Sequence, residues 1–138
     1  MYDIVTKNHV KKILAEQEII LEDDFHIVNE KYSSPEHFTV AISQKDKQKI
    51  IQKIKRSGNF KILKDTTPPN LHNIKFGTKN YHFGEKTTQN FETKEEFVRE
   101  FFKPSNNENY IPEYKQITIS KSQNHLIFTD VYEFIIDP

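Results

Sequence analysis

The clearest pattern of hydrophobic and polar positions lies in residues 43–61, SQKDKQKIIQKIKRSGNFK, and it predicts one complete α-helix. Ser43 is suited to cap the N-terminus, and Asp46, three residues on, is a weak capping-box partner. Gly58 is placed to end the helix. Three isoleucines recur at the spacing of a narrow buried stripe: Ile50, Ile51 and Ile54.

Two further segments have helical spacing. In residues 3–17 one face collects Thr6, Val10, Ile13, Leu14 and Gln17, with His9 at its edge. The second segment begins at Thr93, which forms a capping box with Glu96, and Pro104 ends it. Its predicted buried stripe consists of Phe97, Val98, Phe101 and Phe102.

Strand patterns fill most of the remaining chain. Residues 25–32 and 37–43 alternate or are β-branched, and they predict an antiparallel pair joined at residues 33–36. A short strand is predicted at 59–64, directly after the central helix, which suggests a right-handed crossover. Two hairpins are also predicted, one from 71–76 and 81–85, the other from 115–120 and 125–136.

This order of elements predicts an α+β fold with a mixed or mainly antiparallel sheet and about three helices packed on it. The break at residues 66–70, TTPPN, is too short to separate two domains, so residues 1–138 are interpreted as a single domain. A domain of this length buries about 68% of the surface that its unfolded chain exposes, so no disulfide is needed for a stable core.

Composition excludes several function classes. Twenty basic and twenty acidic residues balance, and only two of the basic residues are Arg, so nucleic acid is an unlikely partner. With no Cys, there are no disulfides, thiolate metal sites or cysteine nucleophiles. Three glycines cannot form the GxGxxG, P-loop or GxSxG motifs, and we expect no cofactor.

The distribution of lysines argues against a membrane protein. Lys7, Lys11 and Lys12 interrupt every apolar stretch of the N-terminus, which predicts neither a signal peptide nor a membrane span. A cytoplasmic location is expected for the natural full-length chain. A secreted protein whose leader had been removed would have the same sequence.

One cationic surface is a candidate binding site. On the helix predicted in residues 43–61, four basic side chains share an arc of about 80°: Lys45, Lys49, Lys53 and Arg56. This basic ridge predicts a protein partner with an acidic surface. Alternatively, it is a solvated face that the chain's own acidic run neutralises, namely Glu16, Glu18, Glu22, Asp23 and Asp24.

A weaker candidate is catalytic. Strand alternation places Asp130 among apolar residues, where a carboxylate acquires a raised pKa and can serve as a general acid or base. His72 or His125 would be its partner. Alternatively, a bulge near Thr129 and Asp130 turns the side chain outward, or the carboxylate forms a buried pair with a Lys or a Tyr hydroxyl. The six histidines lack the HxxxH and HxH spacings of metal ligands, so no metal site is predicted.

Two main functional hypotheses follow. The leading one is a small non-enzymatic domain that acts through protein–protein contact, of the adaptor, inhibitor or immunity-protein type, with the basic ridge as its contact surface. The alternative is a hydrolase-like or small-ligand-binding domain with a sheet-lined pocket around Asp130. Aromatic residues interleaved with basic ones at 71–86 leave single-strand nucleic-acid binding as a third hypothesis.

Overall fold

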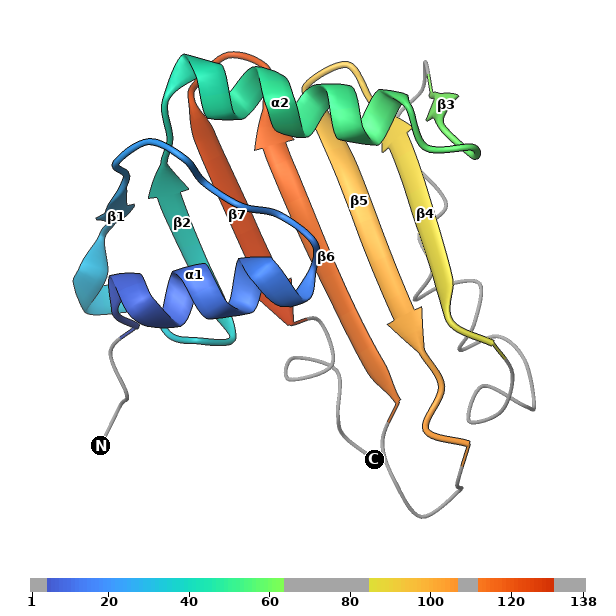
Figure 1. The fold of residues 1–138 in the computed structure, drawn as a ribbon, viewed down its shortest axis with the longest axis horizontal. Coiled ribbons are helices and arrows are strands. Elements are labelled where there is room, and N and C mark those ends of the chain that lie inside the picture. The colour runs from blue at the N-terminus through green and yellow to red at the C-terminus, as the bar shows by residue number, and fades with distance from the viewer. Residues whose placement is uncertain (1–4, 64–84, 107–111, 131–138) are drawn as a thin grey trace.

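The computed structural model describes residues 5–63, 85–106 and 112–130. Within these ranges seven strands form one mixed sheet, in the order β1-β2-β7-β6-β5-β4-β3, and both α-helices lie on the same face of it (Figure 1). The elements are α1 (Lys7–Glu16), β1 (His26–Val28), the 3-10 helix η1 (Glu30–Tyr32), β2 (His37–Ala41), α2 (Gln44–Lys55), β3 (Lys61–Ile62), β4 (Thr87–Glu92), β5 (Glu96–Lys103), β6 (Glu113–Ser120) and β7 (His125–Asp130). The predicted α+β class and mixed sheet are confirmed.

Strand pairing confirms the predicted N-terminal antiparallel pair and, as far as residue 130, the predicted C-terminal hairpin. β1 and β2 are antiparallel with Ile27 opposite Val40, and β6 and β7 are antiparallel with Ile119 opposite Leu126. β3 alone runs parallel to its neighbour, β4. Because β2 and β3 point the same way with four strands between them, α2 is the crossover between two distant parallel strands (Figure 1).

The main hydrophobic core lies between the sheet and the two helices. α1 contributes Val10 and Leu14 to it, and α2 contributes its predicted stripe of isoleucines, all of them buried. From the sheet, Phe38 and Phe128 stack with ring centroids 5.1 Å apart. Burial of each such side chain contributes about 1.5–3 kcal/mol, so this layer holds α2 firmly against the strands.

The opposite face of β4, β5 and β6 contains a buried carboxylate. Glu100 is fully buried, and its Oε2 accepts hydrogen bonds from the Tyr114 hydroxyl (2.6 Å) and the Gln116 amide (2.9 Å). Its other oxygen, Oε1, accepts one from the Gln89 amide (2.9 Å). These donors compensate for the removal of the carboxylate from water.

The helix predicted from Thr93 is wrong, because these residues form strand β5 in a hairpin with β4. The structure therefore has two α-helices in the described residues rather than about three. The Thr93 hydroxyl does accept a hydrogen bond from the Glu96 N–H, but Thr93 N–H also donates to the Glu96 carbonyl, which closes a turn. Both faces of β5 are buried: Phe97 and Phe101 face the helices, and Val98 and Phe102 face the other way. Because both faces are buried, apolar residues occur in adjacent pairs along β5, and this spacing resembles that of a buried helix face.

Smaller differences concern the helix ends. α1 begins at Lys7 rather than residue 3, with Thr6 as its N-cap in a capping box with His9. α2 ends at Lys55 with a right-handed C-cap, and Gly58 lies beyond it without ending the helix. The strand at 59–64 is reduced to two residues. The hairpin predicted around residues 71–85 and the strand beyond residue 130 lie outside the described residues.

Candidate protein-binding site

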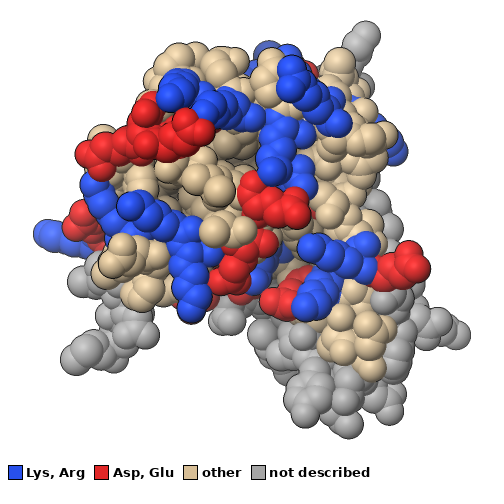
Figure 2. Space-filling model, in the orientation of Figure 1, with Lys and Arg blue, Asp and Glu red and all other residues tan. Residues whose placement is uncertain are grey.

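The basic ridge lies on the outer face of α2, as predicted. Ser43 caps the helix and accepts a hydrogen bond from the Asp46 N–H at 3.0 Å. The isoleucine stripe faces the sheet, so all four ridge residues are exposed. Figure 2 shows basic side chains over α2 at the top of the molecule, with an acidic group beside their left end.

That acidic group neutralises the first half of the ridge. The Glu22 carboxylate forms ion pairs with Lys45, at 3.4 Å, and at closer range with Lys49. The hydrogen bond from Lys49, followed by that from Lys45, lowers the pKa of Glu22 below its usual value. For these two lysines, the chain's own acidic run therefore supplies the counter-charge.

Asp46 holds the acidic run in place. Its carboxylate is buried and accepts hydrogen bonds from the Glu22 N–H at 3.1 Å and the Asp23 N–H at 3.0 Å. The Ser43 hydroxyl completes the link, since it donates to the Asp23 carboxylate at 2.6 Å. Asp46 was predicted to return to the helix N-cap, but it instead fixes a segment more than twenty residues earlier in the chain.

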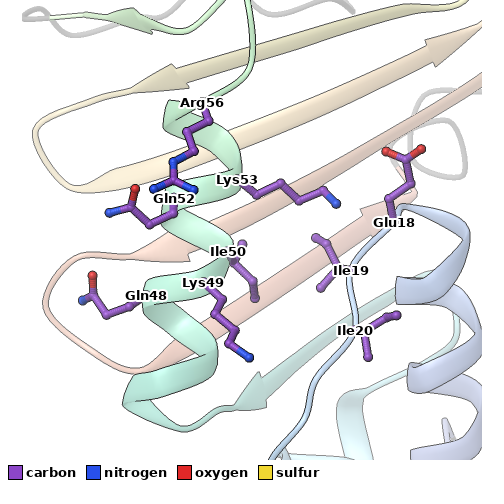
Figure 3. Close-up of a pocket in the computed structure, with 9 residues that line it drawn as sticks. All are labelled: Glu18, Ile19, Ile20, Gln48, Lys49, Ile50, Gln52, Lys53 and Arg56. Atoms are coloured by element: carbon purple, nitrogen blue, oxygen red, sulfur yellow. The ribbon is translucent and has the colours of Figure 1, made fainter.

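Beyond Lys49, an open groove of about 580 Å³ separates α2 from the segment that follows α1 (Figure 3). Ile20 stands on its far wall with 76% of its surface exposed, whereas its neighbour Ile19 is buried. The lining residues are Glu18, Ile19, Ile20, Gln48, Lys49, Ile50, Gln52, Lys53 and Arg56. Ile20 is thus the exposed aliphatic side chain that this groove offers to a partner's apolar group.

Two cations border this groove without being neutralised. Neither Lys53 nor Arg56 forms an ion pair with any residue in the described ranges. In Figure 3 the Lys53 side chain extends from α2 toward the opposite wall, while Arg56 lies beside Gln52. Within the described residues, the second half of the ridge is therefore not compensated by a carboxylate.

The opposite wall is shaped by the end of α1. Glu18 N–H donates to Ala15 and Ile19 N–H to Leu14, which is the Schellman pattern of helix termination. The pattern needs a left-handed residue, and Glu18 occupies that position with φ 64° where glycine is preferred. This turn buries Ile19 and leaves Ile20 exposed.

Glu18 also links this wall to the sheet. Its carboxylate lies 3.7 Å from the guanidinium of Arg99, a half-buried residue of β5 that also bonds to Asn90. Burial lowers the pKa of Arg99, and the charge of Glu18 acts in the opposite direction. The carboxylate on this wall is thus partly compensated, unlike Lys53 and Arg56.

Two of the predicted catalytic residues, Asp130 and His125, are not brought together. His125 and Asp130 stand at the two ends of β7, about 17 Å apart, and strand alternation directs them to opposite faces of the sheet. Asp130 is only partly buried, and it lies on the helix-covered face opposite Lys115. His72 lies outside the described residues, so a site that combines it with Asp130 stays a prediction.

The described residues contain neither a cluster suited to a metal ion nor a helix suited to a membrane. Among residues 5–63, 85–106 and 112–130, no group of three or more His, Asp or Glu side chains is arranged to hold a metal ion. The helices that the structure describes lack the length and apolar character needed to cross a membrane.

Comparison with known proteins identifies no relative. No protein-family model matches the chain, no curated protein is significantly similar to it, and no solved structure matches it. The class defined by the structure is therefore that of its architecture, an α+β fold with a mixed sheet.

Proposed function

We propose that this chain is a small non-enzymatic domain that acts through contact with another protein, of the adaptor, inhibitor or immunity-protein type. Its contact surface is the basic ridge of Lys45, Lys49, Lys53 and Arg56, and its partner presents an acidic surface. Cationic surfaces of this kind select partners by charge and accelerate their association.

One observation carries the proposal: an open groove beside α2 is lined by the exposed Ile20 and by two cations, Lys53 and Arg56, that form no ion pair with a described residue. Apolar contact area bordered by charge is the usual composition of a protein interface. Lys45 and Lys49 are already bound by Glu22, so we expect Lys53 and Arg56 to supply most of the electrostatic contribution.

The test requires a purified partner. Proteins that co-purify with the full chain would be identified, produced separately and titrated back against it by calorimetry. Alanine at all four ridge positions should weaken binding about tenfold or more, because a hot spot loses this much affinity when its side chains are truncated. The Lys53→Ala, Arg56→Ala double variant should account for most of that loss.

A matched control removes the same charge elsewhere. Four exposed lysines outside the ridge serve for this purpose: Lys12, Lys31, Lys61 and Lys94. Their replacement by alanine should leave the affinity unchanged. If the ridge variant binds the partner as tightly as the wild type, the proposed contact surface is wrong.

A further inference from the structure

One segment of the chain itself binds α2 and shows which chemistry this helix face accepts. In the segment after α1, Ile19 is buried in the same core as Ile50 and Ile54, and three residues later the Glu22 carboxylate lies between two lysines of the ridge. An aliphatic side chain followed closely by a carboxylate therefore matches this helix face.

The second half of α2 repeats the same chemistry without an occupant from the described residues. Lys53 follows Lys49 by four residues, as Lys49 follows Lys45, so each pair stands one helical turn apart. Glu22 demonstrates that a single carboxylate fits between lysines at this spacing. In the groove that Lys53 borders, the exposed Ile20 on the other wall replaces the core as the apolar contact.

We infer that the groove binds an acidic segment of a partner protein, in which an aliphatic side chain packs against Ile20 and a nearby carboxylate pairs with Lys53. This inference rests on the proposed function and specifies the partner's chemistry. The groove volume of about 580 Å³ is sufficient for a few side chains of such a segment.

Glu18 determines how the segment lies. Its carboxylate is 69% exposed on the wall opposite α2, and it repels a second carboxylate placed on that side. A bound segment is therefore oriented with its acidic residue toward Lys53 and its aliphatic residue toward Ile20.

The experiment uses three fluorescein-labelled peptides and the full chain. The probe, EIILEDD, copies residues 18–24, and two control peptides each lack one feature: ESSSEDD lacks the aliphatic residues and QIILQNN lacks the carboxylates. Fluorescence anisotropy should show that the probe binds about tenfold more tightly than either control. Sodium chloride should weaken the interaction, because its charged part is exposed.

Variants of the chain locate the peptide. Ile20→Ser and Lys53→Glu should each reduce the affinity for the probe about fivefold or more. The matched controls are Ile62→Ser, at another exposed isoleucine, and Lys31→Glu, at another exposed lysine, and neither should change it. Both groove positions are exposed, and circular dichroism will verify folding.

A second measurement requires no variant. A probe with a photoreactive leucine analogue in place of its central leucine should cross-link to the wild-type chain at Ile20 and its neighbours along the groove. Cross-links confined to other surfaces would overturn the inference.

The remaining outcomes are equally decisive. Equal affinity for ESSSEDD, or no binding of the probe at about 1 mM, overturns the inference. If the wild type associates with itself and Ile20→Ser abolishes this association, the groove is occupied by a second copy of the chain. That result would contradict the inference. If the affinity of the purified partner depends on the basic ridge but not on Ile20, only this inference fails. If the affinity does not depend on the ridge either, the proposed function itself is wrong.

Discussion

The two halves of α2 carry similar charges but use them differently. In the first half, Glu22 binds Lys45 and Lys49, and the buried Asp46 fixes the backbone that carries Glu22. In the second half, Lys53 and Arg56 border an open groove and form no ion pair with a described residue. Tertiary contacts, rather than helix composition, thus distinguish the half that Glu22 neutralises from the half that we propose binds a partner.

Lys47 strengthens this contrast. It is buried, and its ammonium donates to the carbonyls of Lys121 (3.2 Å) and Gln123 (2.9 Å) in the connection between β6 and β7. The first half of α2 is therefore joined both to the segment after α1 and to a turn of the sheet. Beyond Ile50, the described contacts of the helix with the strands are mainly apolar.

The largest effect is expected in the first half of α2, which Asp46 anchors to the segment after α1. Asp46→Ala removes the acceptor of two backbone N–H groups, and it should lower the free energy of unfolding by about 2–3 kcal/mol. Urea denaturation followed by circular dichroism measures this change. As a control, Asp24→Ala removes a carboxylate that is 92% exposed and should change stability by less than about 0.5 kcal/mol. A similarly small effect at Asp46 would show that the first half is not anchored as described.

The anchored half also shows how far sequence reasoning reaches. The Ser43 cap and the isoleucine stripe of α2 were predictable because both depend on residues at most four apart. The true partners of Asp46 are more than twenty residues away, and no local pattern reveals them. The sequence identified the basic ridge but could not show which of its residues would be neutralised.

Strand β5 shows a second limit. Thr93 and Glu96 form the hydrogen bond that a capping box predicts, yet it closes a turn between two strands. Phenylalanine and valine favour strands, and that preference was the available signal against a helix. The decisive fact is the burial of both faces of β5, which depends on the whole sheet. Ile20 was likewise missed, since its exposure depends on the turn at Glu18.

A smaller effect is expected at the groove wall. Glu18→Gly should raise the free energy of unfolding by about 1 kcal/mol, because glycine adopts the left-handed conformation without the steric cost that other residues incur. Thermal and urea denaturation measure the gain. Glu18→Ala, the matched control, loses the same carboxylate but retains the backbone strain, so it should not stabilise. Equal gains in both variants would attribute the effect to charge instead.

The smallest expected effect is a change in the pKa of Glu22, and it distinguishes the two halves of α2. NMR titration of the Glu22 carboxyl should give a pKa below the usual value for glutamate, because Lys49 and Lys45 stabilise its charged form. Lys49→Gln should raise this pKa toward the usual value, whereas Lys53→Gln, one turn further along, should leave it nearly unchanged.

The sign of the accompanying stability change follows from the lowered pKa. The Glu22 ion pairs stabilise the fold above the unfolded-state pKa, about 4.3, and this contribution is lost as the pH falls through the folded-state value. The stability difference between wild type and Glu22→Gln should therefore shrink on acidification. If Lys53→Gln shifted the pKa of Glu22 as much as Lys49→Gln does, Lys53 would also be engaged by the acidic run. The division of α2 into a neutralised and an available half would then be wrong.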